Sequence, residues 1–208
     1  MSALICNYPY ESFEMTNFKR LLCFIFALTV MSLSTFSNAN EYIDLDKRSF
    51  IKQWIKGKNN KVKLEDINTI VAQSYKQGFK HRIDPLLILG IIMVESRFKK
   101  TAYNQSDASG LMQVIPKWHK DKIAKRNIFA IDVNIEVGTT IFHNCLEKFK
   151  YNYNKAFRCY YGGNPAKYMN AVLKYKTSIE DYIIVSQFKY SSPIYLASAN
   201  KQLEILLR

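Results

Sequence analysis

The chain has 208 residues, with 30 Lys and Arg against 17 Asp and Glu, and a formal net charge of +13. This length suits one domain of about 100–200 residues with appendages, and it excludes a chain too short to bury a core. The strongly basic balance favours an anionic partner. The sequence shows no repeat or low-complexity tract.

Residues 1–39 have the pattern of a secretory signal peptide. Lys19 and Arg20 precede the apolar run 21–30, and small residues stand at both key positions of the segment 37–39. The pattern predicts export to the periplasm or the exterior, with cleavage at the end of this segment. The alternative is an uncleaved membrane anchor, although the apolar run is shorter than the roughly 20 residues of a membrane span.

Cleavage of this segment leaves the charge unchanged and halves the cysteine count. Two cations and two carboxylates are lost, so the exported part keeps a net charge of +13, while Cys145 and Cys159 remain. Met15 opens a complete signal peptide by itself. We therefore interpret residues 1–14 as an upstream extension from a misassigned start.

Residues 40–82 are expected to form a short arm or helix, a loop and then an amphipathic helix. The arm, residues 40–63, contains Trp54 among charged residues and ends in a loop. The helix is expected over 64–82 because apolar residues recur there at spacings of three and four. These residues are Leu64, Ile67, Ile70, Val71, Tyr75 and Phe79.

A buried helix is predicted from Pro85 to a carboxylate, Glu95. Asp84 and Pro85 are favourable residues for a helix start. The residues between Pro85 and Glu95 are uncharged, so nearly every face of this helix is apolar and must be buried. Glu95 is therefore partly desolvated, which raises its pKa toward the range of a general acid.

The remaining segments predict further helices and no sheet. A polar loop is expected over 101–110, followed by a helix that starts near Leu111 and is interrupted by Pro116. The apolar spacing and the Gly and Pro stops predict three more helices, over 134–150, 155–161 and 166–175. No segment shows sustained alternation of strand type. The fold class is thus all-α.

Cys145 and Cys159 lie at equal distances from Asn152, within the expected loop of a helical hairpin. Equal distances place both sulfurs at a similar height on the two helices. In an oxidising compartment they are expected to form a disulfide, worth on the order of 3 kcal/mol in the chain-entropy account. The alternative is a pair of small buried thiols.

Three ordered blocks resemble the signature of the SLT-type lytic transglycosylases, relatives of goose-type lysozyme. One such block alone would be a weak signal, but three in the same order are specific. The resemblance covers roughly residues 64–176. The first block spans 95–116 and contains E-S-x-F at 95–98, Ala102, A-x-G-L-M-Q at 108–113 and Pro116. The second block is N-x-x-x-G at 134–138, and the third is C-Y-Y-G-G at 159–163.

The resemblance implies a helical, lysozyme-like domain with one catalytic carboxyl group, that of Glu95. This group would protonate the glycosidic oxygen between N-acetylmuramic acid and N-acetylglucosamine in peptidoglycan. It would then act as a base on the muramyl C6 hydroxyl, so that a 1,6-anhydro end forms without water. The resemblance also implies substrate-binding or supporting roles for Ser96, Phe98, Asn104, Gly110, Met112, Gln113 and Tyr160.

Two departures from the family pattern bear on this interpretation. Tyr161 and Gly162 stand where the third block has Asn and Ala, which bears on how Tyr160 is positioned. Asp107 stands in the loop where the family commonly has Gly. As a second carboxylate it would give the alternative function, a hydrolytic, lysozyme-like muramidase.

Neither a metal nor another cofactor is expected. His81, His119 and His143 form no metal-ligand spacing. For the anionic partner, the glycan strands of peptidoglycan are favoured over nucleic acid after export, because muramyl peptides carry carboxylates. The alternative is that the Lys-rich faces only solvate the protein.

Residues 177–208 lie beyond the resemblance as a C-terminal extension of undetermined role. Wall turnover, a secretion or conjugation apparatus and a phage-derived enzyme would all use the same domain. The extension is the segment expected to bind a partner specific to one of these settings. A further alternative is a catalytically weak, wall-binding component of such an apparatus.

Overall fold

The computed structural model describes residues 47–190, and within this range the regular structure is helical. The all-α prediction is confirmed, since the only β-type pairings among the described residues are isolated bridges from Ser109 to Tyr103 and to Val114. The expected signal peptide and the end of the C-terminal extension, 191–208, lie outside the described residues. The helices are the segment 47–58, α2 (Leu64–His81), α3 (Pro85–Ser96), η1 (Pro116–Trp118), α4 (Lys120–Ile123), α5 (Ile131–Lys148), α6 (Tyr153–Tyr161) and α7 (Pro165–Tyr190).

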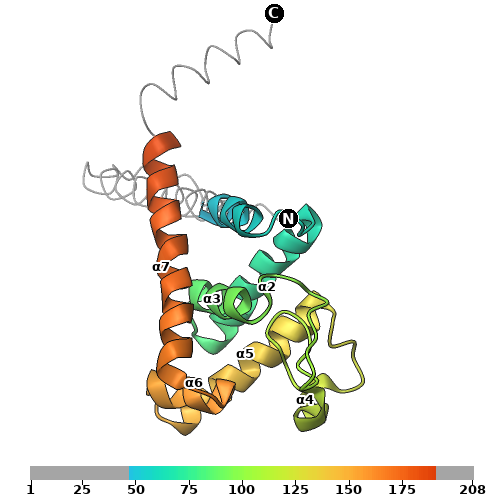
Figure 1. The fold of residues 1–208 in the computed structure, drawn as a ribbon. Helices are drawn as coiled ribbons and strands as arrows, with labels where there is room; N and C mark the ends of the chain where they lie inside the picture. Colours follow the sequence, from blue (N-terminus) through green and yellow to red (C-terminus); the bar gives the residue numbers. More distant parts are fainter. Residues whose placement is uncertain (1–46, 191–208) are drawn as a thin grey trace, which may run out of the picture. The chain divides into compact units, whose positions relative to one another are not determined.

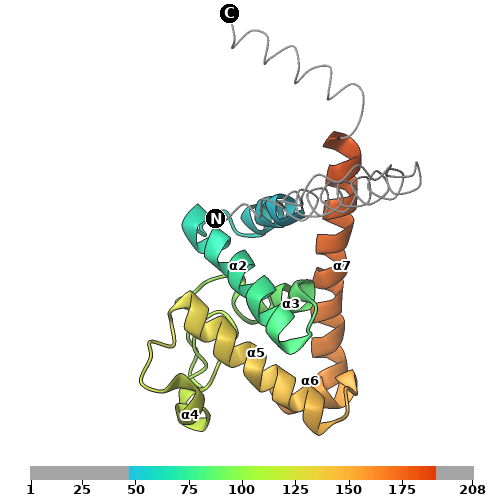
Figure 2. The same ribbon diagram turned by 180° about the vertical axis from the view of Figure 1, so that it is seen from behind.

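The helices contact one another in a closed ring. α3 packs against α2, α2 against α5, α5 against α6, and α6 against the beginning of α7, which returns to α3. Figures 1 and 2 show α7 running along one side of the described part, with α3 against it. This arrangement brings the end of α3 close to the first turns of α7.

α3 is the innermost element, as its apolar sequence predicts. The Asp84 carboxylate accepts a hydrogen bond from the Leu86 amide (2.8 Å), and Pro85 occupies the first helical position. Asp84 also forms an ion pair with Lys176 of α7 (3.2 Å). These contacts fix where α3 begins relative to α7.

Residues 47–58 form a helix, which is one of the two forms expected for the arm, and this helix contributes to the same hydrophobic core as α3. Phe50, Ile51, Trp54 and Ile55 are buried there. Their spacing places them on one face of a helix. The expected arm therefore packs onto the domain through this face.

A disulfide joins Cys145 of α5 to Cys159 of α6. The prediction of a bridged pair is thereby confirmed. Between them the chain turns through Lys150 and Tyr151, both at positive φ, and the Asn152 side chain accepts from the Lys155 amide to begin α6. The bridge thus closes the α5–α6 hairpin.

Two expectations about element boundaries are wrong. No helix begins at Leu111, because residues 109–114 bond to one another and to nearby loop residues through their main chain, and the next helical residues are those of η1. The helix expected over 166–175 continues without interruption to Tyr190. Its later turns keep burying apolar residues, among them Ile179 and Ile183.

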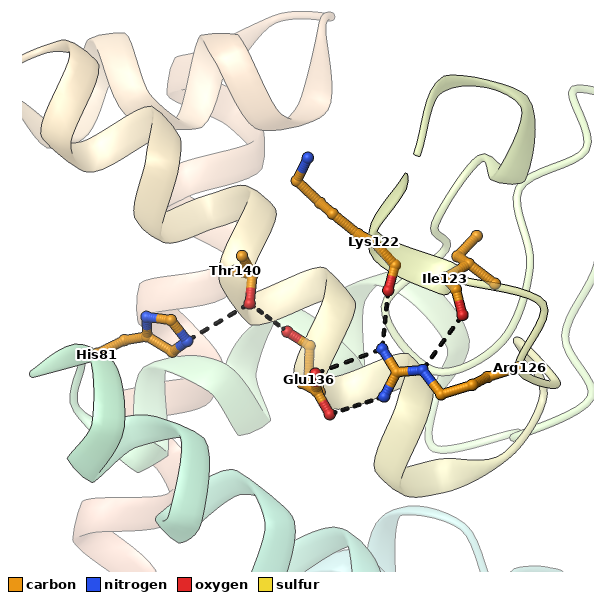
Figure 3. A network of polar contacts seen from close by, with 6 residues as sticks. All are labelled: His81, Lys122, Ile123, Arg126, Glu136 and Thr140. Carbon is orange, nitrogen blue, oxygen red and sulfur yellow. Dashed lines mark hydrogen bonds and ion pairs between the residues drawn. The ribbon is translucent and has the colours of Figure 1, made fainter. Parts of the chain in front are cut away.

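The connection between α4 and α5 is held by one arginine. Arg126 donates two hydrogen bonds to the Glu136 carboxylate (3.0 and 3.4 Å) and two more to the carbonyls of Lys122 and Ile123. Figure 3 shows the guanidinium between the α4 segment and α5. Planar, bidentate pairing of this kind fixes geometry as well as charge. It anchors on α5 the connection that leads from α4 into α5.

Candidate active site

Glu95 lies in the last turn of α3, and the turn that follows it is anchored on the helix 47–58. The chain turns sharply because Arg97 and Phe98 both have positive φ (50° and 64°). The Phe98 ring is 1% exposed and packs edge-on against Trp54, with 6.2 Å between ring centroids. The Asn59 amide donates to the Arg97 carbonyl (2.8 Å). These contacts fix the turn after α3, and they therefore fix the position of Glu95 at the end of that helix.

Burial controls the protonation of Glu95. Desolvation raises its pKa from 4.5 to about 7, whereas a hydrogen bond from the Tyr168 hydroxyl to Oε1 (2.5 Å) acts in the opposite direction. The desolvation effect is the larger of the two. A carboxyl group with this pKa is partly protonated at neutral pH and can both donate and accept a proton there.

Tyr168, on the first turn of α7, is a functional residue that the sequence did not reveal. Its ring stacks on that of Tyr161, with 4.2 Å between centroids and 11° between planes. Gly163 makes room for this stack, because a Cβ there would lie 2.5 Å from Tyr161 Cε1. Tyr161, which departs from the family pattern, thus supports Tyr168, the residue that bonds to Glu95.

The loop between Ala102 and Val114 presents two side-chain amides. The Asn104 Oδ1 accepts from the amides of Ser106 (2.8 Å) and Ala108 (3.2 Å). The Gln113 Nε2 donates to the Gly110 carbonyl (2.9 Å), and the Asn104 Nδ2 donates to Gln113 Oε1 (3.3 Å). These bonds hold both amides in defined positions.

Asn134, the first residue of the second block, fastens this loop to α5. Its side chain is fully buried, accepts from the Met112 amide (2.7 Å) and donates to the Ser109 carbonyl (2.9 Å). Gly110 has φ +76° and lies against the Asn134 amide, where no Cβ would fit. At Gly138 a Cβ would lie 2.6 Å from Met112 Cβ. The block therefore positions the loop and does not itself face the substrate.

Three of the expected site residues are held by contacts within the protein. Met112 is 1% exposed and packs in the core. The Tyr160 hydroxyl donates to the Met112 carbonyl (2.9 Å) and not to Glu95. The Ser96 hydroxyl bonds to the Ile92 carbonyl of its own helix (3.1 Å).

A pocket of about 470 Å³ opens over Glu95. It brings together four of the expected site residues: Glu95, Asn104, Gln113 and Tyr160. Among the described residues that line it, Glu95 is the only one with a carboxyl group. The lining residues are Glu95, Asn104, Ser106, Ala108, Gln113, Ile115, Ile141, Tyr160, Tyr161, Gly162 and Gly163.

Asp107 does not line this pocket. It is exposed, has φ +64° and accepts a hydrogen bond from the Tyr103 hydroxyl (2.6 Å). Within residues 47–190 no group of three or more His, Cys, Asp and Glu side chains is arranged to hold a metal ion. In the same range no helix is long and apolar enough to cross a membrane.

The fold and the pocket define a class: helical domains in which a glutamic acid at the end of a buried helix faces a groove lined by amides and tyrosines. A family model described as the transglycosylase SLT domain matches residues 73–183, just over half of the chain. The chain therefore belongs to the transglycosylase SLT domain family.

Similar proteins carry related names. Membrane-bound lytic murein transglycosylase E of Buchnera aphidicola (from Acyrthosiphon pisum) is 29% identical over 136 residues, which cover 60% of this chain and 58% of that protein. Membrane-bound lytic murein transglycosylase C of Actinobacillus pleuropneumoniae is 46% identical over 55 residues, or 26% of this chain and 14% of that protein. This chain thus matches 58% of the first relative's length and 14% of the second's.

Among solved structures, an inactive mutant of the lytic transglycosylase Slt from Pseudomonas aeruginosa is similar. The sequence identity is 18% and the TM-score is 0.42. The similarity covers 59% of this chain and 25% of that chain.

Proposed function

We propose that this protein is a peptidoglycan lytic transglycosylase. It cleaves the β-1,4 bond between N-acetylmuramic acid and N-acetylglucosamine and leaves a 1,6-anhydro end. The observation that carries the proposal is Glu95, whose pKa burial raises to about 7 and which alone among the described lining residues offers a carboxyl group to the pocket. Membership of the SLT domain family and the names of the relatives support the same activity.

The reaction needs one group that first donates and then accepts a proton. Protonated Glu95 gives its proton to the glycosidic oxygen as the bond from the muramyl C1 to that oxygen breaks. The Glu95 carboxylate then takes the proton of the muramyl C6 hydroxyl while the C6 oxygen forms a bond to C1. The carboxyl group ends protonated again, so neither water nor a second carboxylate is consumed. A pKa near the working pH favours both transfers.

The other lining residues are proposed to hold the glycan. Asn104 and Gln113 present amides, which hydrogen-bond to sugar hydroxyl and acetamido groups. Burial raises the pKa of Tyr168 and of Tyr160, so both hydroxyls remain protonated donors. Tyr168 orients Glu95, and Tyr160 holds the Met112 carbonyl beside the pocket.

A hydrolytic muramidase is less well supported by this geometry. Glycosidases of that kind place two carboxyl groups about 5 to 9.5 Å apart across the scissile bond. The candidate for the second, Asp107, is exposed, bonded to Tyr103 and absent from the pocket lining.

The test is the analysis of products from purified peptidoglycan. Glu95→Gln keeps the shape and the acceptor for Tyr168 but lacks the transferable proton, so activity should fall by at least the roughly 10²–10⁴-fold typical of acid–base catalysis. Asp107→Asn, the matched control, should retain activity within about threefold, because an exposed site away from the pocket contributes little. Reducing muramic ends without anhydro ends, together with loss of activity in Asp107→Asn, would instead identify a muramidase.

We further propose that the enzyme is exported and acts in the periplasm or at a membrane surface. The support is the signal-like pattern of residues 1–39 and the membrane-bound relatives. N-terminal sequencing of the exported protein should begin at Asn40. A chain that retains Met1 or Met15 would contradict cleavage.

The catalytic domain is proposed to span 64–176, and the C-terminal extension is proposed to direct it to a partner. Loss of partner capture on deletion of 191–208 would support this role of the extension. Unchanged capture would contradict it.

A further inference from the structure

Basic residues are concentrated in two short segments of the chain. Residues 47–63 contain seven Lys and Arg and no Asp or Glu, and residues 97–100 contain three more. The second segment directly follows the catalytic helix. These two segments therefore account for ten of the 30 basic residues.

The fold joins the two segments into one surface. The Asn59 side chain donates to the Arg97 carbonyl (2.8 Å), and Trp54 packs against Phe98 with 6.2 Å between ring centroids. These contacts are the same ones that anchor the turn after Glu95. The basic segment 47–63 and the turn after Glu95 are therefore in direct contact.

A pocket of about 450 Å³ lies between the segments, and we call it the lysine pocket. Its lining includes Lys61, Lys63, Lys99 and Lys100, with Asp66 as the only acidic residue. Lys100 and Asp66 form an ion pair with each other (2.8 Å). Among residues 47–190 no carboxylate lies within ion-pair distance of the other three lysines.

The lysine pocket and the candidate active site take lining residues from one stretch of chain. The segment 95–104 contributes Glu95 and Asn104 to the active-site pocket. The residues between them, Phe98 to Thr101, line the lysine pocket. The lysine pocket is therefore lined in part by residues that follow Glu95 by three to six positions in the chain.

We propose that the lysine pocket binds the carboxylate-bearing peptides that are attached to the muramic acid residues of the glycan strand. This inference rests on the proposed function. Lysine acts as a compact point charge on a flexible stem, so a cluster of lysines accepts carboxylates in several geometries. The buried Phe98 and Val62 give the pocket an apolar floor for the side chains of such a peptide. The glycan occupies the active-site pocket while a peptide occupies the lysine pocket.

The test measures binding without turnover, in the full chain carrying Glu95→Gln. The probes are soluble glycan fragments with their peptides and the same fragments after enzymatic removal of the peptides. The pocket variant is Lys61→Gln/Lys63→Gln/Lys99→Gln. The control, Lys125→Gln/Lys155→Gln/Lys174→Gln, removes the same charge from exposed positions on other elements.

The pocket variant should bind peptide-bearing fragments about tenfold more weakly, because each exposed ion pair contributes modestly. The control variant should change by less than twofold, and peptide-free fragments should bind equally to the parent and both variants. Equal losses in the two variants would overturn the proposal, as would an equal loss on peptide-free fragments.

Two further measurements make the outcome of the test unambiguous. If the pocket variant loses binding to vesicles of anionic phospholipid while peptide-bearing fragments bind as before, the basic surface serves a membrane and the proposal fails. If the triple variant does not fold, Lys99→Gln is compared with Lys125→Gln, with an expected two- to threefold loss. Failure of the proposed function would be seen separately, as absence of anhydro products from the protein with intact Glu95.

Discussion

Glu95 experiences two opposing influences, and their balance sets its working pH. Burial favours the neutral carboxylic acid, whereas the hydrogen bond from Tyr168 favours the carboxylate. The hydrogen bond keeps the pKa from rising further above neutrality. Tyr168 therefore affects the pKa of Glu95 as well as its orientation.

Replacement of Tyr168 by Phe should move the pH profile. Without the hydroxyl the carboxylate loses a donor worth on the order of 1.5–3 kcal/mol, so the pKa of Glu95 should rise by about one unit or more. Because the free enzyme must hold a protonated Glu95, the alkaline limb of kcat/KM should shift to higher pH. The limb is measured as the initial rate of anhydro-product release from soluble glycan across pH 5–9.

Tyr160→Phe is the matched control for this change. It also removes a buried hydroxyl, but one that donates to the Met112 carbonyl and not to Glu95. It should raise KM or lower stability and leave the alkaline limb in place. A limb that stays fixed in Tyr168→Phe, or moves to lower pH, would contradict the role assigned to Tyr168.

The sequence was sufficient to predict the burial of Glu95 but not its hydrogen-bond partner. Glu95 could be predicted because an uncharged helix runs directly into it, so its burial follows from local sequence. Tyr168 lies 73 residues further on, and only the packing of α7 on α3 brings it near. Met112 shows the complementary limit, since its position in the motif does not reveal that its side chain is buried.

At the scale of elements, the crossing of α3 and α7 places Tyr168 against Glu95. The helices are in close contact at Gly90, where a Cβ would lie 2.7 Å from the Val172 carbonyl oxygen. Glu95 lies five residues after Gly90 and Tyr168 lies four residues before Val172. At 1.5 Å per residue, these steps correspond to about 7.5 Å along α3 and about 6 Å along α7. Both side chains are long enough to span the remaining distance, and the Tyr168 hydroxyl bonds to Glu95 Oε1.

Gly90→Ala should disturb this crossing. The new methyl group meets a main-chain carbonyl, which cannot move unless α7 shifts, and overpacking of this kind costs typically 1–3 kcal/mol. Activity should also fall, because the shift separates Tyr168 from Glu95. Thermal unfolding followed by circular dichroism, together with the rate of product release, measures both effects.

Gly57→Ala provides the comparison. Gly57 is helical, and a Cβ there would have no atom within 4 Å, so alanine at this position should stabilise by up to about 1 kcal/mol. Activity should be unchanged. A Gly90→Ala protein as stable and active as the parent would show that close approach at Gly90 is not required.

Periodicity predicted the helices well where burial is one-sided or complete, as in α2 and α3. It failed between Ala102 and Pro116, because the main chain there bonds mostly within the loop itself and the loop is held by the distant Asn134. Periodicity also predicted an end for α7 that is too early. The later turns of α7 bury apolar residues against the helix 47–58, but these residues are more widely spaced in the sequence than in the first turns. These outcomes depend on tertiary contacts, which local patterns do not encode.

At the scale of the whole molecule, the buried Glu95 carboxyl group lowers the free energy of unfolding as the pH rises. The other buried polar residues in the active-site region, such as Asn134, are hydrogen-bonded and neutral. Glu95 instead must carry a charge in a desolvated position whenever the pH exceeds its folded-state pKa. Functional sites commonly hold such locally unfavourable groups.

Glu95→Gln should therefore stabilise the protein, and only at higher pH. The pKa rises from 4.5 in the unfolded chain to about 7 in the folded protein, so the folded state binds more protons between these values and its stability falls as pH rises through them. The total loss is on the order of 3 kcal/mol, complete above pH 7 and absent below pH 4.5. Glutamine has no such titration, so urea unfolding of parent and variant should give similar stabilities near pH 4 and a more stable variant at pH 8. Because all other titrating groups are common to both proteins, they cancel in the difference. A difference that does not change with pH would mean that burial does not raise the pKa of Glu95, and the proposed acid would lose its physical basis.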